Sequence, residues 1–86
     1  MLLYTPLNLN KEGILKMTKK EAIQIILNDR KSYGTSLNYA VNYCKTALDI
    51  KGDALDTQCL YILNNITHWR HPQAKDVRKV LRKKGD

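Results

Sequence analysis

The side chains best suited to chemistry gather in one tetrapeptide, His68-Trp69-Arg70-His71, which joins two imidazoles, an indole and a guanidinium. The two cysteines of the chain, Cys44 and Cys59, are the other residues that suggest a metal site. Successive gaps of 14, 8 and 2 residues separate the cysteines and the histidines. Structural zinc sites pair their cysteines at much closer spacing. We therefore expect no metal site; instead Trp69 should pack at the end of a helix, with the histidines exposed or capping the turn before Pro72.

Nucleophilic chemistry has no better support. Cys44 and Cys59 fall at apolar helix positions, where a buried free thiol is the usual state of a cysteine. The chain has no glycine-rich phosphate loop, no GxSxG motif and no arrangement of paired carboxylates. A helical bundle of this size also offers little room for a concave pocket. We expect no enzymatic activity and no cofactor.

Length and composition fit one small folded domain. The chain has 86 residues, of which 43% are hydrophobic and 27% charged, and its formal net charge is +7. No stretch reaches the roughly 18–20 apolar residues that a membrane span needs, and the N-terminus lacks the basic region of a signal peptide. We expect no membrane association and a cytoplasmic protein, in the host cytoplasm if a phage encodes it.

The native start is open between Met1 and Met17. The tripeptide Lys11-Glu12-Gly13 can be encoded by a purine run like a bacterial ribosome-binding site, a short distance before the Met17 codon. Residues 1–16 are therefore either a translated leader or a genuine N-terminal extension. Residues 17–86 are predicted to form a single helical domain.

The first predicted helix covers residues 18–32. Thr18 and Glu21 have the spacing of a capping box, in which each side chain accepts a hydrogen bond from the other residue's backbone amide. Ala22, Ile23, Ile26 and Leu27 follow as one apolar stripe. Gly34 is expected to end this helix in the left-handed conformation.

The second predicted helix covers residues 36–51, capped by Thr35 or Ser36 and ended by Gly52. Its apolar residues recur at helical spacing rather than in the alternation of a strand. They are Leu37, Ala40, Val41, Cys44 and Leu48.

Two further helices are predicted over residues 54–69 and 72–84. The first opens after Asp53 and is the most apolar; Pro72 suits the first position of the second. The buried face of helix 54–69 should comprise Leu55, Cys59, Ile62, Ile66 and Trp69, and that of helix 72–84 Ala74, Val77, Val80 and Leu81. The predicted fold class is all-α, with three antiparallel helices plus a short basic C-terminal helix, because the turns between helices are short.

The net charge is concentrated at the C-terminal end. Residues 70–86 hold seven Lys or Arg and two Asp, so +5 of the +7 lies in these seventeen residues. Charge beside an aromatic residue is a composition favoured at interfaces. The predicted partner-binding or nucleic-acid-binding residues are Trp69, Arg70, Lys75, Arg78, Lys79, Arg82 and Lys83.

Three kinds of partner fit these features. The first hypothesis is a non-enzymatic interaction protein that binds and modulates another macromolecule, with a protein partner as the leading expectation. The second is a nucleic-acid-binding regulator that uses the basic helix, with binding that weakens steeply as salt rises. The third is a homodimer that buries Leu60, Leu63 or Ile25 between copies. A helix-turn-helix is disfavoured because helix 54–69 is too apolar for a recognition helix.

Two segments resemble small uncharacterised helical proteins of phages and prophages of low-GC Gram-positive bacteria. One is MTKKEAIQIIL, which begins the predicted domain at Met17. The other is the stretch YILNNITHWR together with the later AKDVRKVLRK. The resemblance covers about residues 17–84 and includes no functional motif. It implies a non-enzymatic protein that acts on a host or phage protein or on nucleic acid.

Overall fold

The structure is a computed structural model that describes residues 17–84. Within this range it is all-helical, with four α-helices and one 3-10 turn and without a strand, as the fold class predicted. The elements are α2 (Lys19–Asn28), η2 (Arg30–Ser32), α3 (Ala40–Ala47), α4 (Asp53–Asn64) and α5 (Ala74–Arg82). The predicted leader, residues 1–16, lies outside the described residues.

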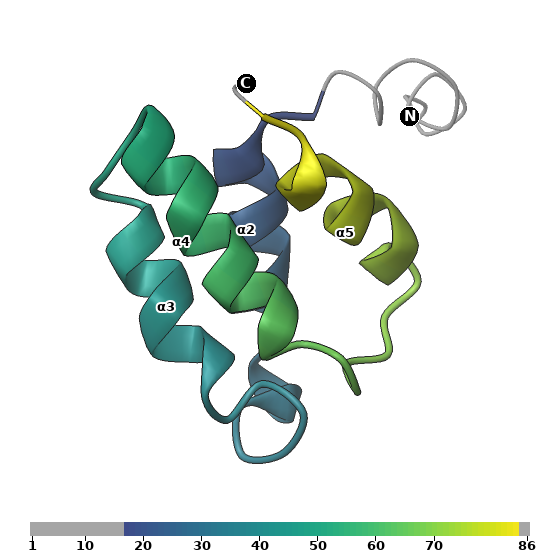
Figure 1. Cartoon of the computed structure of the whole chain (residues 1–86). Helices are drawn as coiled ribbons and strands as arrows, with labels where there is room; N and C mark the ends of the chain where they lie inside the picture. The colour runs from purple at the N-terminus through teal and green to yellow at the C-terminus, as the bar shows by residue number, and fades with distance from the viewer. Residues whose placement is uncertain (1–16, 85–86) are drawn as a thin grey trace, which may run out of the picture.

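The four α-helices pack in a closed ring of contacts. α2 and α4 each contact both α3 and α5. In Figure 1, α3 and α4 run side by side, α2 lies behind α4, and α5 crosses on the other side. Each helix therefore buries an apolar face toward one shared core.

The predicted apolar faces form that core. Every residue predicted to be buried on α2, on α4 and its following loop, and on α5 is at most 8% exposed. On the second predicted helix Leu37, Ala40 and Cys44 are buried, whereas Val41 and Leu48 are half-buried and pack against the core edge. The helical periodicity therefore identified the inward face of each element correctly.

The start of α2 agrees with its sequence signal. The Glu21 amide donates to Thr18 Oγ1 at 3.1 Å, and the Thr18 amide donates to Glu21 Oε1 at 2.9 Å, which completes the capping box. The two lysines that follow contact other helices. Lys19, only 1% exposed, lies with Nζ 3.6 Å from the Asp56 carboxylate in the first turn of α4. Lys20 Nζ donates to the Leu48 carbonyl at 2.7 Å, just after α3.

The first two predicted helices are longer than the observed ones. The helix over 18–32 ends at Asn28, because Asp29 has a non-helical ψ of 67°, and η2 follows. Gly34 has no positive φ, so the predicted left-handed stop is wrong. The helix over 36–51 begins only at Ala40: Tyr39 stands at its cap position, and the Thr35 hydroxyl donates to the Ser32 carbonyl within the preceding turn.

The end of α3 and the bounds of the last two helices also differ from prediction. α3 stops at Ala47, and Gly52, with φ 68°, instead precedes α4 directly. α4 ends at Asn64, so Trp69 lies in the loop after the helix rather than on it. Pro72 is not the first residue of α5, which begins two residues later at Ala74. In the loop between α4 and α5, hydrogen bonds to Asp29 and Arg78 take the place of the helical hydrogen bonds that the prediction implied.

Candidate binding surface between α4 and α5

The loop between α4 and α5 contains a fully buried tryptophan, Trp69. Its side chain is 0% exposed, and its indole Nε1 donates a 2.8 Å hydrogen bond to the carboxylate of Asp29, which is itself only 8% exposed. The Ser32 hydroxyl donates to the same carboxylate oxygen at 2.8 Å. The His71 ring stacks on the indole with centroids 5.1 Å apart. Trp69 therefore ties the loop to the end of α2.

Arg78 of α5 holds the same loop from the other side. Its Nη2 donates to the carbonyl oxygens of Ile66 at 2.8 Å and of Trp69 at 2.9 Å. The side chain is half-buried, and both bonds satisfy backbone acceptors that lie beyond the end of α4. We call this set of residues, Asp29, Ser32, Trp69, His71 and Arg78, the Trp69 anchor.

These contacts correct the predicted binding surface at two positions. Trp69 is buried, so its side chain is not available to a partner in this fold. Arg78 is a structural residue of the loop as well as a cation, so replacing it changes more than the surface charge. The other five predicted positions are exposed: Arg70, Lys75, Lys79, Arg82 and Lys83.

The carboxylate of the Trp69 anchor is kept ionised. The hydrogen bond from Trp69 is the largest cause that lowers the pKa of Asp29 below its ordinary 3.8, followed by the bond from Ser32. Burial opposes this shift, and the nearby positive charges of His71 and Lys31 add to it. Asp29 therefore stabilises the fold in its charged form.

This shift predicts a pH dependence of stability. A lowered folded-state pKa adds stability above the unfolded pKa of about 3.9, which is lost as the pH falls through the folded value. Asp29→Asn should therefore unfold more easily than the wild type at pH 7, by a margin that shrinks steadily below about pH 4. Urea unfolding of both proteins across this pH range measures the difference between their free energies of unfolding. The other carboxylates are the same in both proteins, so their effects cancel in this difference. A margin that does not change between pH 7 and pH 2.5 would contradict the role of the Asp29 charge.

The two cysteines are buried thiols and do not form a disulfide with each other, as expected from their helix positions. Burial raises the pKa of the Cys44 thiol to about 12, with a smaller contribution from the neighbouring Cys59. A thiol in this environment is protonated at neutral pH and is a poor nucleophile. Among residues 17–84 no group of three His, Cys, Asp or Glu lies close enough to hold a metal ion.

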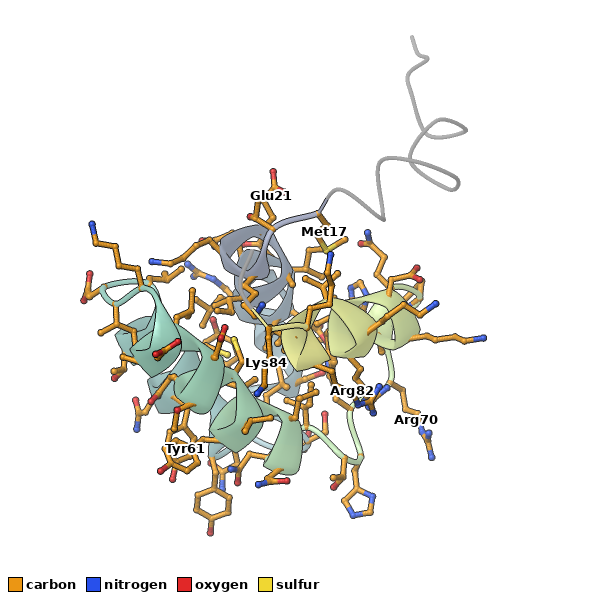
Figure 2. All side chains as sticks on the ribbon, turned by 45° about the horizontal axis from the view of Figure 1, so that its top comes forward. Met17, Glu21, Tyr61, Arg70, Arg82 and Lys84 are labelled. Atoms are coloured by element: carbon orange, nitrogen blue, oxygen red, sulfur yellow. The ribbon has the colours of Figure 1, made fainter. Side chains whose placement is uncertain are left out.

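A groove of about 610 Å³ lies between α4 and α5. Its lining combines apolar and cationic side chains: Leu60, Leu63, Asn64, Thr67, Arg78 and Arg82. Leu60 is 53% exposed, so the groove presents apolar surface next to the cationic side chain of Arg82. Figure 2 shows Arg82 at the last position of α5, Lys84 just beyond that helix, and Arg70 projecting away from the preceding loop. We call this feature the α4–α5 groove; within the described part of the chain, no carboxylate lines it.

Three tyrosines are exposed on or next to α3 and α4. Tyr39 is 72% exposed, Tyr61 49% and Tyr43 39%. Tyr43 and Tyr61 contact each other across α3 and α4, with ring centroids 5.9 Å apart. Tyr39 and Tyr43 flank the apolar stripe of the second predicted helix, which is consistent with packing at the edge of the core or with stacking on single strands. The 72% exposure of Tyr39 disagrees with packing at the edge of the core. The turn at residues 33–39, which replaces the expected helix, removes Tyr39 from the regular helix face.

Sequence reasoning missed the partners of the Trp69 anchor and the groove itself. Asp29 lies 40 residues before Trp69, and no local pattern connects them. The available signal for the groove was Leu60, which lies beside the apolar stripe of α4 rather than within it.

Comparison with known proteins adds no relative. No family model, no curated protein and no solved structure matches the chain. The resemblance to small phage proteins therefore stays a prediction. None of the described helices is long and apolar enough to cross a membrane.

Proposed function

We propose that this chain is a small non-enzymatic binding domain whose α4–α5 groove holds part of an anionic macromolecule. The proposal keeps the predicted architecture, in which three antiparallel helices support a short basic C-terminal helix. It also keeps the expectation of a phage-like modulator. The observation that carries it is the exposed Leu60 and half-buried Leu63 beside Arg82, in a groove where none of the described lining residues is a carboxylate.

The chemistry of the groove favours an anionic partner with flat or apolar groups. Lys79 lies about one helical turn before Arg82, and Lys83 directly follows it. Both lysines are exposed, so their positive charges add to that of Arg82 at the edge of the groove. The apolar floor supplies contact area that charge alone does not give, because exposed ion pairs contribute little affinity. Both an acidic protein segment and a nucleic acid carry the required charge.

Charge reversal of Arg82, which lines the groove, together with Lys79, an exposed residue one turn earlier on α5, tests this function. Lys79→Glu/Arg82→Glu should abolish capture of the partner from a lysate of the native host cell. The matched control is Lys45→Glu/Lys51→Glu, which makes the same change in net charge at exposed positions outside the lining of the groove. Arg78 is left intact because it belongs to the Trp69 anchor. Capture of the same molecules by all three proteins would contradict the proposal.

A homodimer is the second candidate, and the exposed Leu60, Tyr61 and Tyr43 favour it. Of the residues predicted for such a contact, Ile25 and Leu63 are half-buried against the core and offer less surface. Light scattering of the same three proteins at high concentration separates the two functions. A stable dimer mass that survives the groove variants would support the homodimer instead.

A further inference from the structure

A second hollow adjoins the α4–α5 groove at the C-terminal end of α4. It measures about 280 Å³ and shares Asn64 and Thr67 with the groove. Its other lining residues come from the turn before α3 and the loop after α4: Thr35, Ser36, Asn38, Tyr39, Asn65 and His68. A ligand that lies in both sites must therefore cross Asn64 and Thr67. We call this second site the Tyr39 hollow.

The Tyr39 hollow is lined mainly by polar side chains, which are those of threonine, serine, asparagine and histidine. Thr35 and Asn65 already donate to backbone carbonyls, at 3.3 and 2.8 Å. No internal hydrogen bond engages the side chains of the other polar lining residues, Ser36, Asn38, Asn64, Thr67 and His68. Among residues 17–84, no carboxylate, lysine or arginine lines this hollow. Its donors and acceptors suit an uncharged hydrogen-bonding group rather than a second anion.

Tyr39 adds a free aromatic face to these groups. At 72% exposure its ring is the most open of the large hydrophobic side chains described. Tyr43, one helical turn later, is engaged with Tyr61, whereas no ring contact holds Tyr39. Aromatic side chains of this kind stack on nucleobases.

We propose that the anionic macromolecule is a single-stranded nucleic acid that crosses the end of α4, with phosphate against Arg82 and a base against Tyr39. This inference rests on the proposed function of the α4–α5 groove. A single strand offers the two chemistries in alternation, since its backbone is anionic and its bases are flat, neutral and rich in hydrogen-bonding groups. Asparagine side chains bind base edges in pairs of hydrogen bonds. In a duplex the base faces are stacked inside, so none is open to Tyr39.

An acidic protein segment accounts for less of the surface. It would satisfy the rim of the α4–α5 groove but has no need of an open aromatic ring beside unpartnered amides. Both sites are also open surface features, and the Tyr39 hollow is smaller than the roughly 300–1,000 Å³ of small-molecule sites. A polymer that lies across both uses them better than a single small ligand.

Fluorescence anisotropy of the full chain with a labelled oligothymidylate of about 16 nucleotides tests the inference, because sites of about 4–16 nucleotides are usual for single-strand binders. Tyr39→Ala should weaken binding by about 5- to 150-fold, the equivalent of one lost stacking contact. Tyr39→Phe should bind as the wild type, since it keeps the ring. The matched control, Tyr61→Ala, removes a tyrosine outside both sites and should also bind as the wild type. Wild-type binding should weaken with added salt, and Arg82→Ala should reduce the slope by about 0.7 for one lost phosphate contact.

Three results would overturn the inference. The first is equal affinity of the wild type and Tyr39→Ala, which would show that no base lies on Tyr39. The second is the absence of oligothymidylate binding at low salt, and the third is equally tight binding of a polyglutamate peptide of the same length. If capture from the host lysate still depends on Lys79 and Arg82 in that case, the proposed function stands and only the nucleic acid is excluded.

Discussion

Trp69→Ala should lower the free energy of unfolding by about 3–5 kcal/mol, the largest effect expected from a single substitution in this chain. The indole is completely buried among α2, α5 and the loop, so its removal leaves a cavity. It also leaves Asp29 as a buried carboxylate without its main hydrogen-bond donor. Urea unfolding followed by circular dichroism measures the loss.

Small domains have only about 5–15 kcal/mol of stability, so Trp69→Ala can leave the domain unfolded. Trp69→Phe keeps most of the buried area and removes the Nε1 donor, and it should cost about 1–3 kcal/mol. Its deficit should also shrink below about pH 4, as Asp29 becomes protonated. A Trp69→Phe protein as stable as the wild type at pH 7 would refute the hydrogen bond to Asp29 as a stabilising contact.

Arg78→Ala should cost about 2–3 kcal/mol, because hydrogen bonds from a charged donor contribute about 1.5–3 kcal/mol. The substitution leaves the carbonyls of Ile66 and Trp69 without this donor and releases α5 from the loop. Thermal unfolding and urea titration at pH 7 measure the change.

The matched controls are Lys79→Ala and Arg82→Ala, which remove the same charge from exposed positions of the same helix. Substitutions of this kind usually change stability by less than 0.5 kcal/mol. Equal losses in all three variants would mean that Arg78 acts only through the charge of α5. The expected difference explains why charge reversal at Arg78 cannot serve as a test of binding.

Local signals predicted most of the helical fold. The capping box at Thr18 and Glu21 formed as expected, because both partners lie within one turn of the same helix. The inward faces followed from helical periodicity, which brings residues three and four apart onto one side. The helix ends were less predictable. Asp29 and Trp69 were both predicted to lie within helices, but both lie beyond the observed helix ends and form a hydrogen bond with each other.

The candidate site depended more on tertiary structure than the core did. The sequence located the basic residues of α5 but could not separate Arg78, which bonds to the loop, from Arg82, which lines the groove. It also associated Trp69 with the surface, because an aromatic residue beside arginine is typical of both interfaces and buried anchors. The contact with Asp29 distinguishes the two.

The sequence by itself determined the all-helical class, the face of each helix that is buried and the clustering of positive charge toward the C-terminus. These properties depend on residue type and on spacing within a single helix. Only the tertiary structure decided that Trp69 bonds to Asp29, that Arg78 holds a loop, and that two hollows meet at Asn64 and Thr67. Those features join residues far apart in the chain, and the packing of whole helices sets their distances.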